Sequence, residues 1–419
     1  MRTIFHCDIN NCFASIEMAM NPSLRGLPIA VCGDPASRRG IVLAKSEKAK
    51  ACGVSTGDPL WRAREKCPDI RFIPPHFEVY ERYSRNFRKY LLQYTPKVEP
   101  YGLDECWMDV SSRQFARVRD ALPIAEKIRQ DIWRIFGVTV SVGVSFNKVF
   151  AKIGSDMKKP DAVTVIDKDE FKYKIWSLPV TALLGVGRST AAKLHQRGIY
   201  TIGQLAESPR EYLSDMFGKN GRMLHQYANG WDESPVALFG ERRERQSLGH
   251  GTTLPADVWS LVQLWPVIES LAEQIAFTLQ SECLGAYGIQ IMVRDQTLQF
   301  HQYQMTVRTV LESSHSIAEY AQMLLDQKYD WNLGVHAFEI RLYQLVKKSQ
   351  PRQLSLFEYR NPDRIRQEKQ NLDTDTVIQQ IQQRFGDASI NRGYQLEMFH
   401  RQPGFFPGCE PVDGMKQVS

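Results

Sequence analysis

The first third of the chain alternates between short apolar runs and segments whose apolar side chains recur every three or four positions. Runs of the first kind are typical of strands, and segments of the second kind are typical of helices. In order, the pattern predicts strand 3–7, helix 11–20, strand 28–32, helix 59–66, helix 77–94, strands 97–101 and 106–110, helix 116–136, strand 138–144 and a helix that opens near residue 147. This mixed order favours an α+β core.

The rest of the chain separates into a helical stretch, a charged break and a second folded unit. Residues 178–230 are mostly helical with their own turn signature, which favours a separate helical unit. The charged stretch 241–245 lacks hydrophobic periodicity and is interpreted as a linker. The pattern then predicts strand 249–254, helix 259–280, two strands within 286–307, helix 316–327 and strand 335–345. This βαββαβ order is typical of a split-βαβ sandwich. The tail from residue 347 is polar, with one helix-like piece at 377–385.

Composition narrows the class of protein without identifying it. At 419 residues the chain is longer than one hydrophobic core usually serves, so we expect several domains. Hydrophobic residues make up 43% and charged residues 24%, which is ordinary for a globular protein and excludes disorder throughout. A net charge of +6 is compatible with a polyanionic partner but too small to establish one.

Cysteine usage and hydropathy indicate an intracellular protein. The 8 cysteines are scattered, with no Cys-x-x-Cys pair and no histidine at a zinc-binding spacing, so we interpret them as reduced thiols. The N-terminus lacks the charged and long apolar regions of a signal peptide, and no window approaches the roughly 18 apolar residues of a membrane span. We therefore expect a soluble, cytoplasmic protein with no membrane partner.

Three carboxylates lie where predicted strands end. Asp8 ends the first strand, and Asp104 and Glu105 lie at the tip of the hairpin made by 97–101 and 106–110. Neighbouring acids raise each other's pKa unless a cation lies between them. Magnesium prefers oxygen ligands, and two such ions about 3.5 to 4 Å apart can hold both oxygens of a phosphoryl displacement. The spacing alone also fits an exposed turn, and both interpretations stay open at this point.

Three stretches around these acids carry a family resemblance. They are HCDINNCFASIE (6–17), LDECWMD (103–109) and SFNKVFAKIGSDMKKP (145–160). In order and spacing they resemble three motifs of the Y-family DNA polymerases of the DinB/UmuC type, and the resemblance extends from residue 1 to about residue 357. It implies a low-fidelity enzyme that copies past damaged template bases, with primer-template DNA and dNTPs as partners.

The resemblance implies a multidomain α+β fold shaped like a right hand. The palm, a mixed sheet with helices, would comprise 1–10 and 76–166, and the small fingers 11–75. A helical thumb with a helix-hairpin-helix would span 167–236, followed by a linker at 237–246. The βαββαβ unit at 247–346 would be the little finger, a DNA-gripping domain, and a tail would follow at 347–419. We expect a monomer.

The resemblance also assigns the catalytic metal ligands. Asp8, Asp104 and Glu105 match the family's acidic positions, and the backbone carbonyl of Ile9 would join them. Together they would hold two Mg²⁺ ions, which Mn²⁺ can replace.

A nucleotide pocket follows from the same motifs. Phe13 matches the bulky steric-gate position, where its ring would clash with a ribose 2′-hydroxyl, and the adjacent Cys12 would line the same pocket. Lys159 and Lys50 match basic positions that meet the incoming triphosphate, where a cation neutralises charge on the leaving group. From the residues alone, Phe13 can also be a core aromatic and Lys50 an exposed lysine.

Near the triphosphate the sequence departs from the DinB pattern. Many DinB relatives have a second acid two residues after the first, and a tyrosine three residues before the Lys50 position. This chain has Asn10 and Glu47 there, and Asn10 and the run 49–59 look closer to the UmuC branch. A carboxylate beside a triphosphate is electrostatically unfavourable, which leaves the phosphate contacts of the fingers in question.

Glycine-rich and basic positions are assigned to DNA binding. Residues 184–198 resemble a helix-hairpin-helix, in which Gly185 and Gly187 let backbone amides approach a phosphate where a helix begins with Arg188. Such contacts position DNA without reading its sequence. A tight turn without a ligand would give the same pattern. The linker adds three basic residues that would follow the DNA backbone unless they are merely solvated: Arg242, Arg243 and Arg245.

A short apolar motif lies just past the last predicted strand. It resembles the pentapeptide by which bacterial polymerases dock on the sliding clamp, and consists of Gln353, Leu354, Ser355, Leu356 and Phe357. Apolar anchors with a polar hook suit a preformed pocket. Exposed without a partner, the same segment would be a liability. The sequence therefore predicts a sliding clamp as partner, and a looser copy at 395–399 carries no prediction.

Two other classes of protein share part of this pattern. A nucleotidyl cyclase has a similar palm and paired acids but needs neither a helix-hairpin-helix nor a clamp peptide. A catalytically inactive, polymerase-like accessory protein would bind DNA without needing Asp8, Asp104 and Glu105. The sequence therefore favours an active DNA-directed DNA polymerase, with the inactive accessory protein as the alternative.

Overall fold

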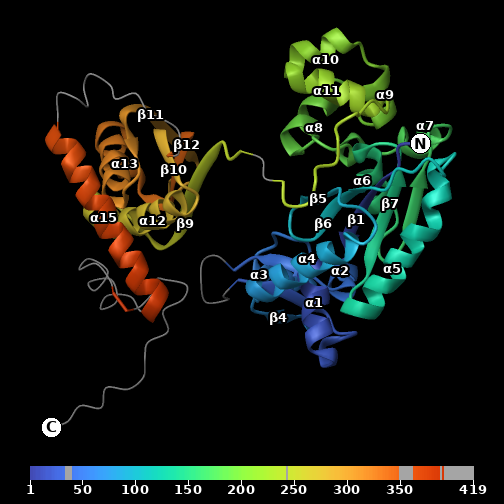
Figure 1. The fold of residues 1–419 in the computed structure, drawn as a ribbon, viewed down its shortest axis with the longest axis horizontal. Coiled ribbons are helices and arrows are strands. Elements are labelled where there is room, and N and C mark those ends of the chain that lie inside the picture. Colours follow the sequence, from blue (N-terminus) through green and yellow to red (C-terminus); the bar gives the residue numbers. More distant parts are fainter. Residues whose placement is uncertain (34–39, 242–243, 349–361, 387–388, 391–419) are drawn as a thin grey trace. The chain divides into compact units, whose positions relative to one another are not determined.

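The computed structural model of the chain describes residues 1–33, 40–241, 244–348, 362–386 and 389–390. These divide into two compact units, Met1–Arg242 and Arg243–Ser419, each with its own hydrophobic core (Figure 1). None of the helices in the described ranges has the length and apolar character that a membrane span requires.

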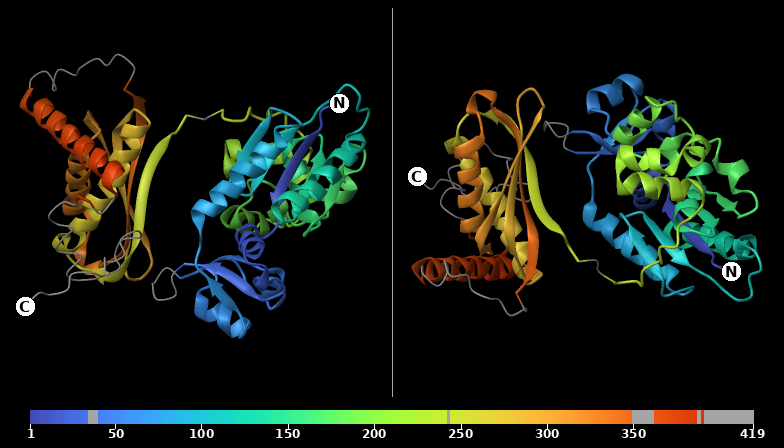
Figure 2. Two further views of the ribbon diagram at one scale, coloured as in Figure 1. Left: turned by 60° about the horizontal axis from the view of Figure 1, so that its bottom comes forward. Right: turned by 90° about the horizontal axis from the view of Figure 1, so that it is seen from above.

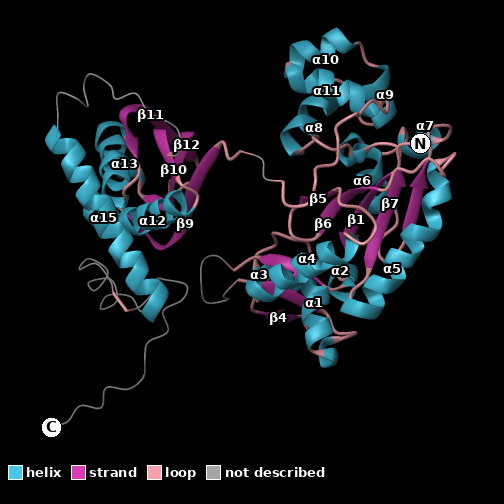
Figure 3. Cartoon of the chain, viewed as in Figure 1, coloured by secondary structure: helices cyan, strands magenta, loops and turns pink. Residues whose placement is uncertain are grey.

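A five-stranded sheet in the order β5-β6-β1-β7-β8 is the centre of the first unit (Figure 3). β1 pairs antiparallel with β6 and β7, and β8 pairs parallel with β7. Both β1 and β7 are buried along their whole length, as expected for strands covered on two faces. The strands are β1 (Ile4–Ile9), β5 (Val98–Tyr101), β6 (Glu105–Asp109), β7 (Val140–Ser145) and β8 (Val163–Ile166).

Three helices pack on this sheet: α4 (Phe77–Leu91), α5 (Leu122–Phe136) and α6 (Lys148–Met157). α4 and α5 contact each other, and α6 contacts β1, β7 and β8. The Asn147 side chain caps the start of α6 by accepting a hydrogen bond from the backbone amide of Phe150. Gly143 in β7 permits the close approach of α6, because a Cβ there would lie 1.8 Å from the carbonyl oxygen of Ala151.

The two faces of β1 and β6 carry different residue types. Successive side chains of a strand point to opposite faces, so paired residues share a face. Cys7 and its partner Cys106 join the main hydrophobic core. Asp8 and its partner Glu105 lie on the other face, over which α6 passes.

A three-stranded sheet in the order β3-β2-β4 forms a smaller lobe of the first unit. α1 leads into it from β1, and its buried side chains belong to the main core. α2 and α3 supply part of a separate small core with the sheet. The elements are α1 (Cys12–Met20), η1 (Pro22–Leu24), β2 (Ile29–Cys32), β3 (Val42–Lys45), α2 (Glu47–Ala51), α3 (Leu60–Lys66) and β4 (Arg71–Ile73).

Short helices make up the end of the first unit, as the sequence predicts. α9 carries a capping box, in which the Thr201 side chain accepts from the amide of Gln204 and the Gln204 side chain accepts from the amide of Thr201. The elements are α7 (Phe171–Ile175), η3 (Val180–Ala182), α8 (Arg188–His195), α9 (Ile202–Glu207), α10 (Arg210–Phe217) and α11 (Lys219–Ala228).

The second unit has the predicted βαββαβ order. Its four strands form an antiparallel sheet in the order β11-β10-β12-β9. In Figure 2 helices α12 and α13 cover one face of this sheet, and no helix of the described residues covers the other. The elements are β9 (Ser247–Val258), α12 (Leu261–Ser281), β10 (Leu284–Arg294), β11 (Phe300–Leu311), α13 (Ser314–Lys328), η4 (Trp331–Leu333) and β12 (Val335–Lys347).

A long C-terminal helix, α15 (Pro362–Phe385), packs on α12 and α13. Its Asp375 is buried and accepts hydrogen bonds from the backbone amide of Ser314, at 2.8 Å, and from its hydroxyl, at 2.7 Å. Glu368 accepts from the amide of Ser313 at 3.1 Å. Two acids of α15 thus satisfy amides at the start of α13, where the helix dipole favours negative charge.

Several element boundaries differ from the sequence prediction. The helix predicted from residue 116 begins at Leu122, because the Asp120 carboxylate accepts from the amides of Ala116 and Arg117, and a 3₁₀ turn, η2 (Val118–Ala121), follows. The helix predicted at 377–385 begins at Pro362. Glu105 is the first residue of β6 and not part of the turn. The short strands β3, β4 and β8 were not predicted.

Candidate active site

Two of the predicted metal ligands face each other on paired strands. Asp8 of β1 and Glu105 of β6 are register partners. Their carboxylates and the ring of His6 each offer a ligand atom, and these atoms lie within 4.8 Å of one another. Asp8 is 5% exposed and Glu105 is half-buried, so this acidic group lies largely out of water.

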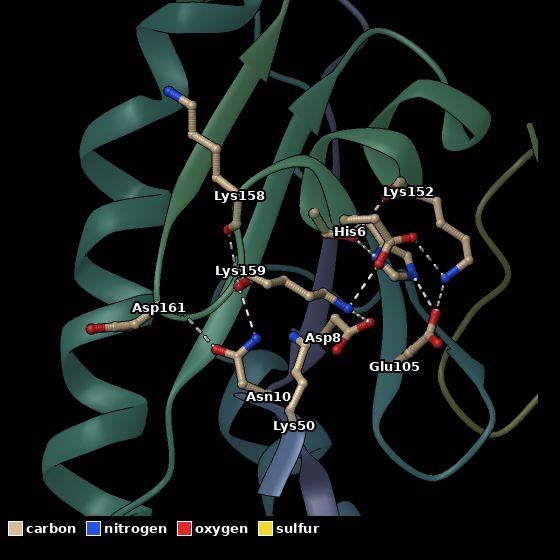
Figure 4. A network of polar contacts seen from close by, with 12 residues as sticks. His6, Asp8, Asn10, Lys50, Glu105, Lys152, Lys158, Lys159 and Asp161 are labelled. Atoms are coloured by element: carbon tan, nitrogen blue, oxygen red, sulfur yellow. Dashed lines mark hydrogen bonds and ion pairs between the residues drawn. The ribbon is translucent and has the colours of Figure 1, made fainter. Parts of the chain in front are cut away.

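Lysines of the α6 region lie against both carboxylates (Figure 4). Lys159 Nζ lies 2.8 Å from Asp8 Oδ2 and 2.8 Å from Asp156 Oδ1. Lys152, from the second turn of α6, donates to Glu105 Oε2. These two ammonium groups bring positive charge next to the acids.

Burial and these contacts act in opposite directions on the carboxyl groups. Burial raises the pKa of Asp8 to about 6, although the charge of Lys159 pulls it down. Burial would also raise the pKa of Glu105, but its contacts with His6 and Lys152 outweigh burial and bring that pKa to about 2. Of these two acids, Asp8 is therefore the one whose charge is less compensated.

His6 connects the acidic group to α6. Its ring is fully buried, with Nδ1 2.8 Å from the Ser155 hydroxyl and Nε2 3.0 Å from Glu105 Oε2. Burial lowers the pKa of His6, which favours the neutral ring. His6 lies in the first sequence motif, but nothing in the sequence indicates a role for it. Only the register of β1 and β6 brings it to Glu105.

Asp104 is the third predicted ligand and lies at the turn before β6. Its carbonyl oxygen accepts from the amide of Ile9 at 3.0 Å, so its backbone is tied to the end of β1. Burial, followed by the charge of Glu105, raises the pKa of Asp104. Its carboxylate is not one of the group that lies within 4.8 Å. The structure thus brings Asp8 and Glu105 together and places Asp104 beside them.

Helix α4 holds the turn that carries Asp104. The Ser84 hydroxyl donates to the carbonyl of Leu103, and Arg88 Nη2 donates to the carbonyl of Gly102. Gly102 has a φ of 80°, a left-handed conformation that glycine adopts without strain. These two contacts with α4 therefore hold the turn in place.

This donor set fits a hard divalent cation. Carboxylate oxygens are the ligands that Mg²⁺ and similar ions prefer. The raised pKa values of Asp8 and Asp104 show that their negative charge is costly where they lie, so the site would gain by taking up positive charge. Asp8, Asp104 and Glu105 are the residues that could hold such ions.

Phe13 lies on α1, one turn after the end of β1, and is locked by aromatic packing. Its ring stacks on Tyr80 with centroids 4.3 Å apart and an interplanar angle of 10°, and meets the edge of Phe77 at 6.0 Å. The Tyr80 hydroxyl donates to Glu17. Cys12 is 6% exposed, and burial, then the charge of Asp104, raises its pKa. Phe13 is half-buried and Cys12 is almost entirely enclosed.

Lys50 lies on α2 and points toward Asp8 in Figure 4. Its ammonium lies 3.7 Å from Glu47 Oε1, and the same oxygen accepts from Asn11 Nδ2 at 2.7 Å. Asn11 has a φ of 47°, a left-handed conformation that asparagine tolerates. Glu47 thus links α2 to the start of α1 beside the predicted triphosphate contacts.

The predicted DNA contacts are only partly within the described residues. Gly187 precedes α8 and nothing lies within 4 Å of where its Cβ would be, so the first amides of α8 and the exposed Arg188 are accessible. Gly185 has a φ of 93°. Arg245 pairs with Glu282 at 2.8 Å. The other predicted contacts lie outside the described residues: Arg242, Arg243 and the peptide 353–357.

Three family models match the chain along most of its length. Residues 7–156 match the impB/mucB/samB family, residues 245–356 match its C-terminal domain, and residues 181–232 match a thumb domain described for DNA polymerase iota. A DNA polymerase IV of Acetivibrio thermocellus is 41% identical over 396 residues, which is 94% of this chain and 98% of that protein. The chain belongs to the Y-family of DNA polymerases.

Other comparisons agree with this Y-family assignment. DNA polymerase IV 1 of Halalkalibacterium halodurans is 35% identical over 411 residues, which is 95% of this chain and 94% of that protein. A solved Y-family DNA polymerase chimera, Dbh-Dpo4(243-245)-Dbh, shares the fold with a TM-score of 0.73 at 23% identity, over 82% of this chain and 99% of that one. This right-hand fold has a palm of mixed sheet and helices, small fingers, a helical thumb, whose family model matches residues 181–232, and a βαββαβ little finger. The five-stranded mixed sheet corresponds to the palm and the βαββαβ second unit to the little finger.

Proposed function

We propose that this Y-family protein is a DNA-directed DNA polymerase that extends primers across damaged template. Asp8, Asp104 and Glu105 hold two divalent ions, with Mg²⁺ as the ion used in the cell, and the carbonyl of Ile9 is a fourth ligand. When bound, such ions stabilise charge on the attacking and leaving oxygens of an in-line phosphoryl transfer.

The observation that supports this function best is the pairing of Asp8 with Glu105 on the face of the palm beneath α6. Both acids are carried by regular strands, so their backbone positions are fixed before any ligand binds. An inactive accessory protein would gain nothing from keeping partly buried acids whose charge is as costly as that of Asp8. The acids are therefore better explained by catalysis than by DNA binding alone.

The nucleotide pocket follows from residues around these acids. Lys159 and Lys50 meet the triphosphate of an incoming dNTP, because both ammonium groups lie on the Asp8 side of the site (Figure 4). Phe13 is the steric gate. A ring stacked on Tyr80 cannot rotate away without losing that contact, so a 2′-hydroxyl directed at it would meet a fixed obstacle.

The thumb and the little finger grip the DNA backbone. Gly185, Gly187 and Arg188 present the start of α8 to a phosphate, where amides and the helix dipole favour an anion. Arg242, Arg243 and Arg245 add phosphate contacts from the linker. Binding through phosphates falls steeply with salt and does not depend on sequence.

A sliding clamp binds the peptide 353–357, which the chain places between β12 of the little finger and α15. Leu356 and Phe357 are its apolar anchors. Replacing both with alanine should leave distributive extension unchanged and abolish stimulation by a bacterial sliding clamp. Unaltered stimulation would place the clamp contact elsewhere.

One assay tests the proposed function. The full chain is mixed with a primer annealed either to an undamaged template or to a template with one abasic site, with dNTPs and with Mg²⁺ or EDTA. We expect extension on both templates with Mg²⁺, including product past the abasic site, and none with EDTA. DNA binding without extension on the undamaged template would favour the accessory protein instead.

A further inference from the structure

We propose that Lys152 is a built-in counter-cation, which neutralises Glu105 in the metal-free enzyme and competes with the divalent ion for that carboxylate. This inference rests on the proposed function of Glu105 as a metal ligand. It assigns a task to a residue that neither the sequence motifs nor the proposed triphosphate contacts explain.

Lys152 places its ammonium group directly against the Glu105 carboxylate. Its ammonium donates to Glu105 Oε2, the same oxygen that lies 3.0 Å from His6 Nε2. The side chains of Lys152 and Glu105 are 17% and 20% exposed. A pair this far out of water is screened weakly, so its attraction is larger than that of a surface pair.

A second lysine of α6 forms a more enclosed ion pair with this sheet and serves as a comparison. Lys148, one turn earlier, lies 2.6 Å from Glu99 on β5, with side chains 8% and 10% exposed. Its ammonium also lies over the Trp107 ring at 4.5 Å, and Glu99 accepts a further hydrogen bond from the amide of Ala237. That pair is enclosed on all these sides and ties the palm to the chain that leaves the thumb.

Lys152 differs from Lys148 because other partners for its ammonium group lie close to it. Its ammonium is 3.7 Å from Asp156 Oδ2 and 5.4 Å from the centre of the exposed Tyr101 ring. A shift of the flexible side chain toward these groups would free Glu105 without leaving the ammonium unpaired. The carboxylate of Asp156 is 50% exposed, so the released lysine would also gain water.

Charge balance explains why such a residue is useful. Asp8, Asp104 and Glu105 bring three negative charges to one partly buried place, and in the metal-free protein Lys152 and Lys159 place positive charge against Glu105 and Asp8. This compensation stabilises the empty site. The same compensation weakens metal binding, because the ion must displace the ammonium from the oxygen that it takes over.

The test measures metal affinity directly. Mn²⁺ binding to the full chain without DNA or nucleotide is followed by electron paramagnetic resonance of the free ion. We expect Lys152→Met to tighten Mn²⁺ binding at least about fivefold, because removing one competing charge at about 4 Å has this effect even in bulk water and a larger one where the charges are screened less. The Tm of the metal-free variant should fall by about 2 to 4 °C, because the acids lose a counter-charge.

Two further variants make the measurement specific. Lys158→Met is the matched control, since Lys158 is exposed and its side chain points away from the acids in Figure 4, and it should leave Mn²⁺ affinity unchanged. In a Glu105→Gln background, Lys152→Met should no longer tighten binding, because the shared carboxylate is gone. If Lys152→Met does not fold, Lys152→Gln takes its place in the same comparison.

The outcomes separate this inference from the proposed function. If Glu105→Gln leaves the Mn²⁺ affinity unchanged, both in the parent protein and in Lys152→Met, the metal site itself is rejected. Binding that depends on Glu105 but is unchanged or weakened by Lys152→Met would keep the metal site and reject Lys152 as its competitor.

Discussion

Asp8 and Glu105 are register partners on two antiparallel strands of the palm, and each carboxylate contacts a different lysine of the α6 region. The strands fix where the acids are, and α6 fixes where their counter-charges are. Gly143 makes this arrangement possible, because any larger residue at this position would push α6 away from the sheet. The geometry of the candidate site therefore depends on how α6 packs on the five-stranded sheet.

The packing of Phe13 predicts sugar selection. Replacing Phe13 with alanine removes the ring that stacks on Tyr80 and opens space where a 2′-hydroxyl would project. We expect the preference for dNTP over rNTP, measured as the ratio of kcat/KM values, to fall at least about tenfold. Phe77→Ala, which removes a neighbouring ring of the same cluster, is the control and should keep the preference. An unchanged ratio in Phe13→Ala would remove its role as gate.

Glu47 should weaken nucleotide binding. Its carboxylate lies 3.7 Å from Lys50 and accepts from Asn11, so it places negative charge next to a proposed triphosphate contact. Glu47→Gln keeps an acceptor for Asn11 but loses the charge. We expect the KM for dNTP to fall about fivefold, since one charge at about 4 Å in water is worth about 1 kcal/mol.

The matched control for Glu47 is Glu65→Gln, which makes the same charge change on the exposed side of α3 and should leave KM unchanged. A higher KM in Glu47→Gln would mean that Glu47 assists nucleotide binding, and would contradict this account.

Acid should loosen one hairpin of the little finger. Hydrogen bonds from Thr297 and then His301 hold the pKa of the buried Asp295 below its ordinary 3.8. Because the folded pKa is the lower one, Asp295 contributes its stability fully above the ordinary pKa and loses it as pH falls through the folded value. Asp295→Asn should therefore loosen the hairpin at pH 7 and differ less from the parent in strong acid.

The stability of the hairpin is measured by the hydrogen exchange of the Thr297 and Gln299 amides, because both amides donate to Asp295. Parent and variant are compared at the same pH, so that the intrinsic exchange rates cancel. A difference in protection that stays constant from neutral pH to strong acid would show that the carboxylate charge is not what holds the hairpin.

The sequence predicts the main architecture because most elements have strong local patterns. The long strands and helices of the second unit follow from hydrophobic periodicity, and the βαββαβ order was confirmed. α15 was predicted only in its last part, because its residues are largely polar and the contact that holds it is made by Asp375 with Ser314, 61 positions away. β4 was missed because a strand of 3 residues is too short to show alternation.

The candidate site was predictable to the extent that it lies in contiguous motifs. Asp8, Asp104 and Glu105 follow from the motifs that resemble the Y-family, because their spacing alone also fits an exposed turn. The contact of Lys152 with Glu105 spans 47 positions and depends on how α6 lies over the sheet, which no local pattern reveals. The same holds for His6, whose neighbours come from β6 and α6.

The most direct test of the central claim is primer extension by Asp8→Asn, which keeps the shape of the side chain and removes its charge. We expect Mg²⁺-dependent extension to fall at least about a hundredfold, a loss typical of removing one electrostatic group from an active site. Primer-template binding should be retained. Asp109→Asn, at the other end of the β1–β6 pair, should extend normally. Extension by Asp8→Asn at the rate of the parent protein would contradict the assignment of Asp8 as a metal ligand.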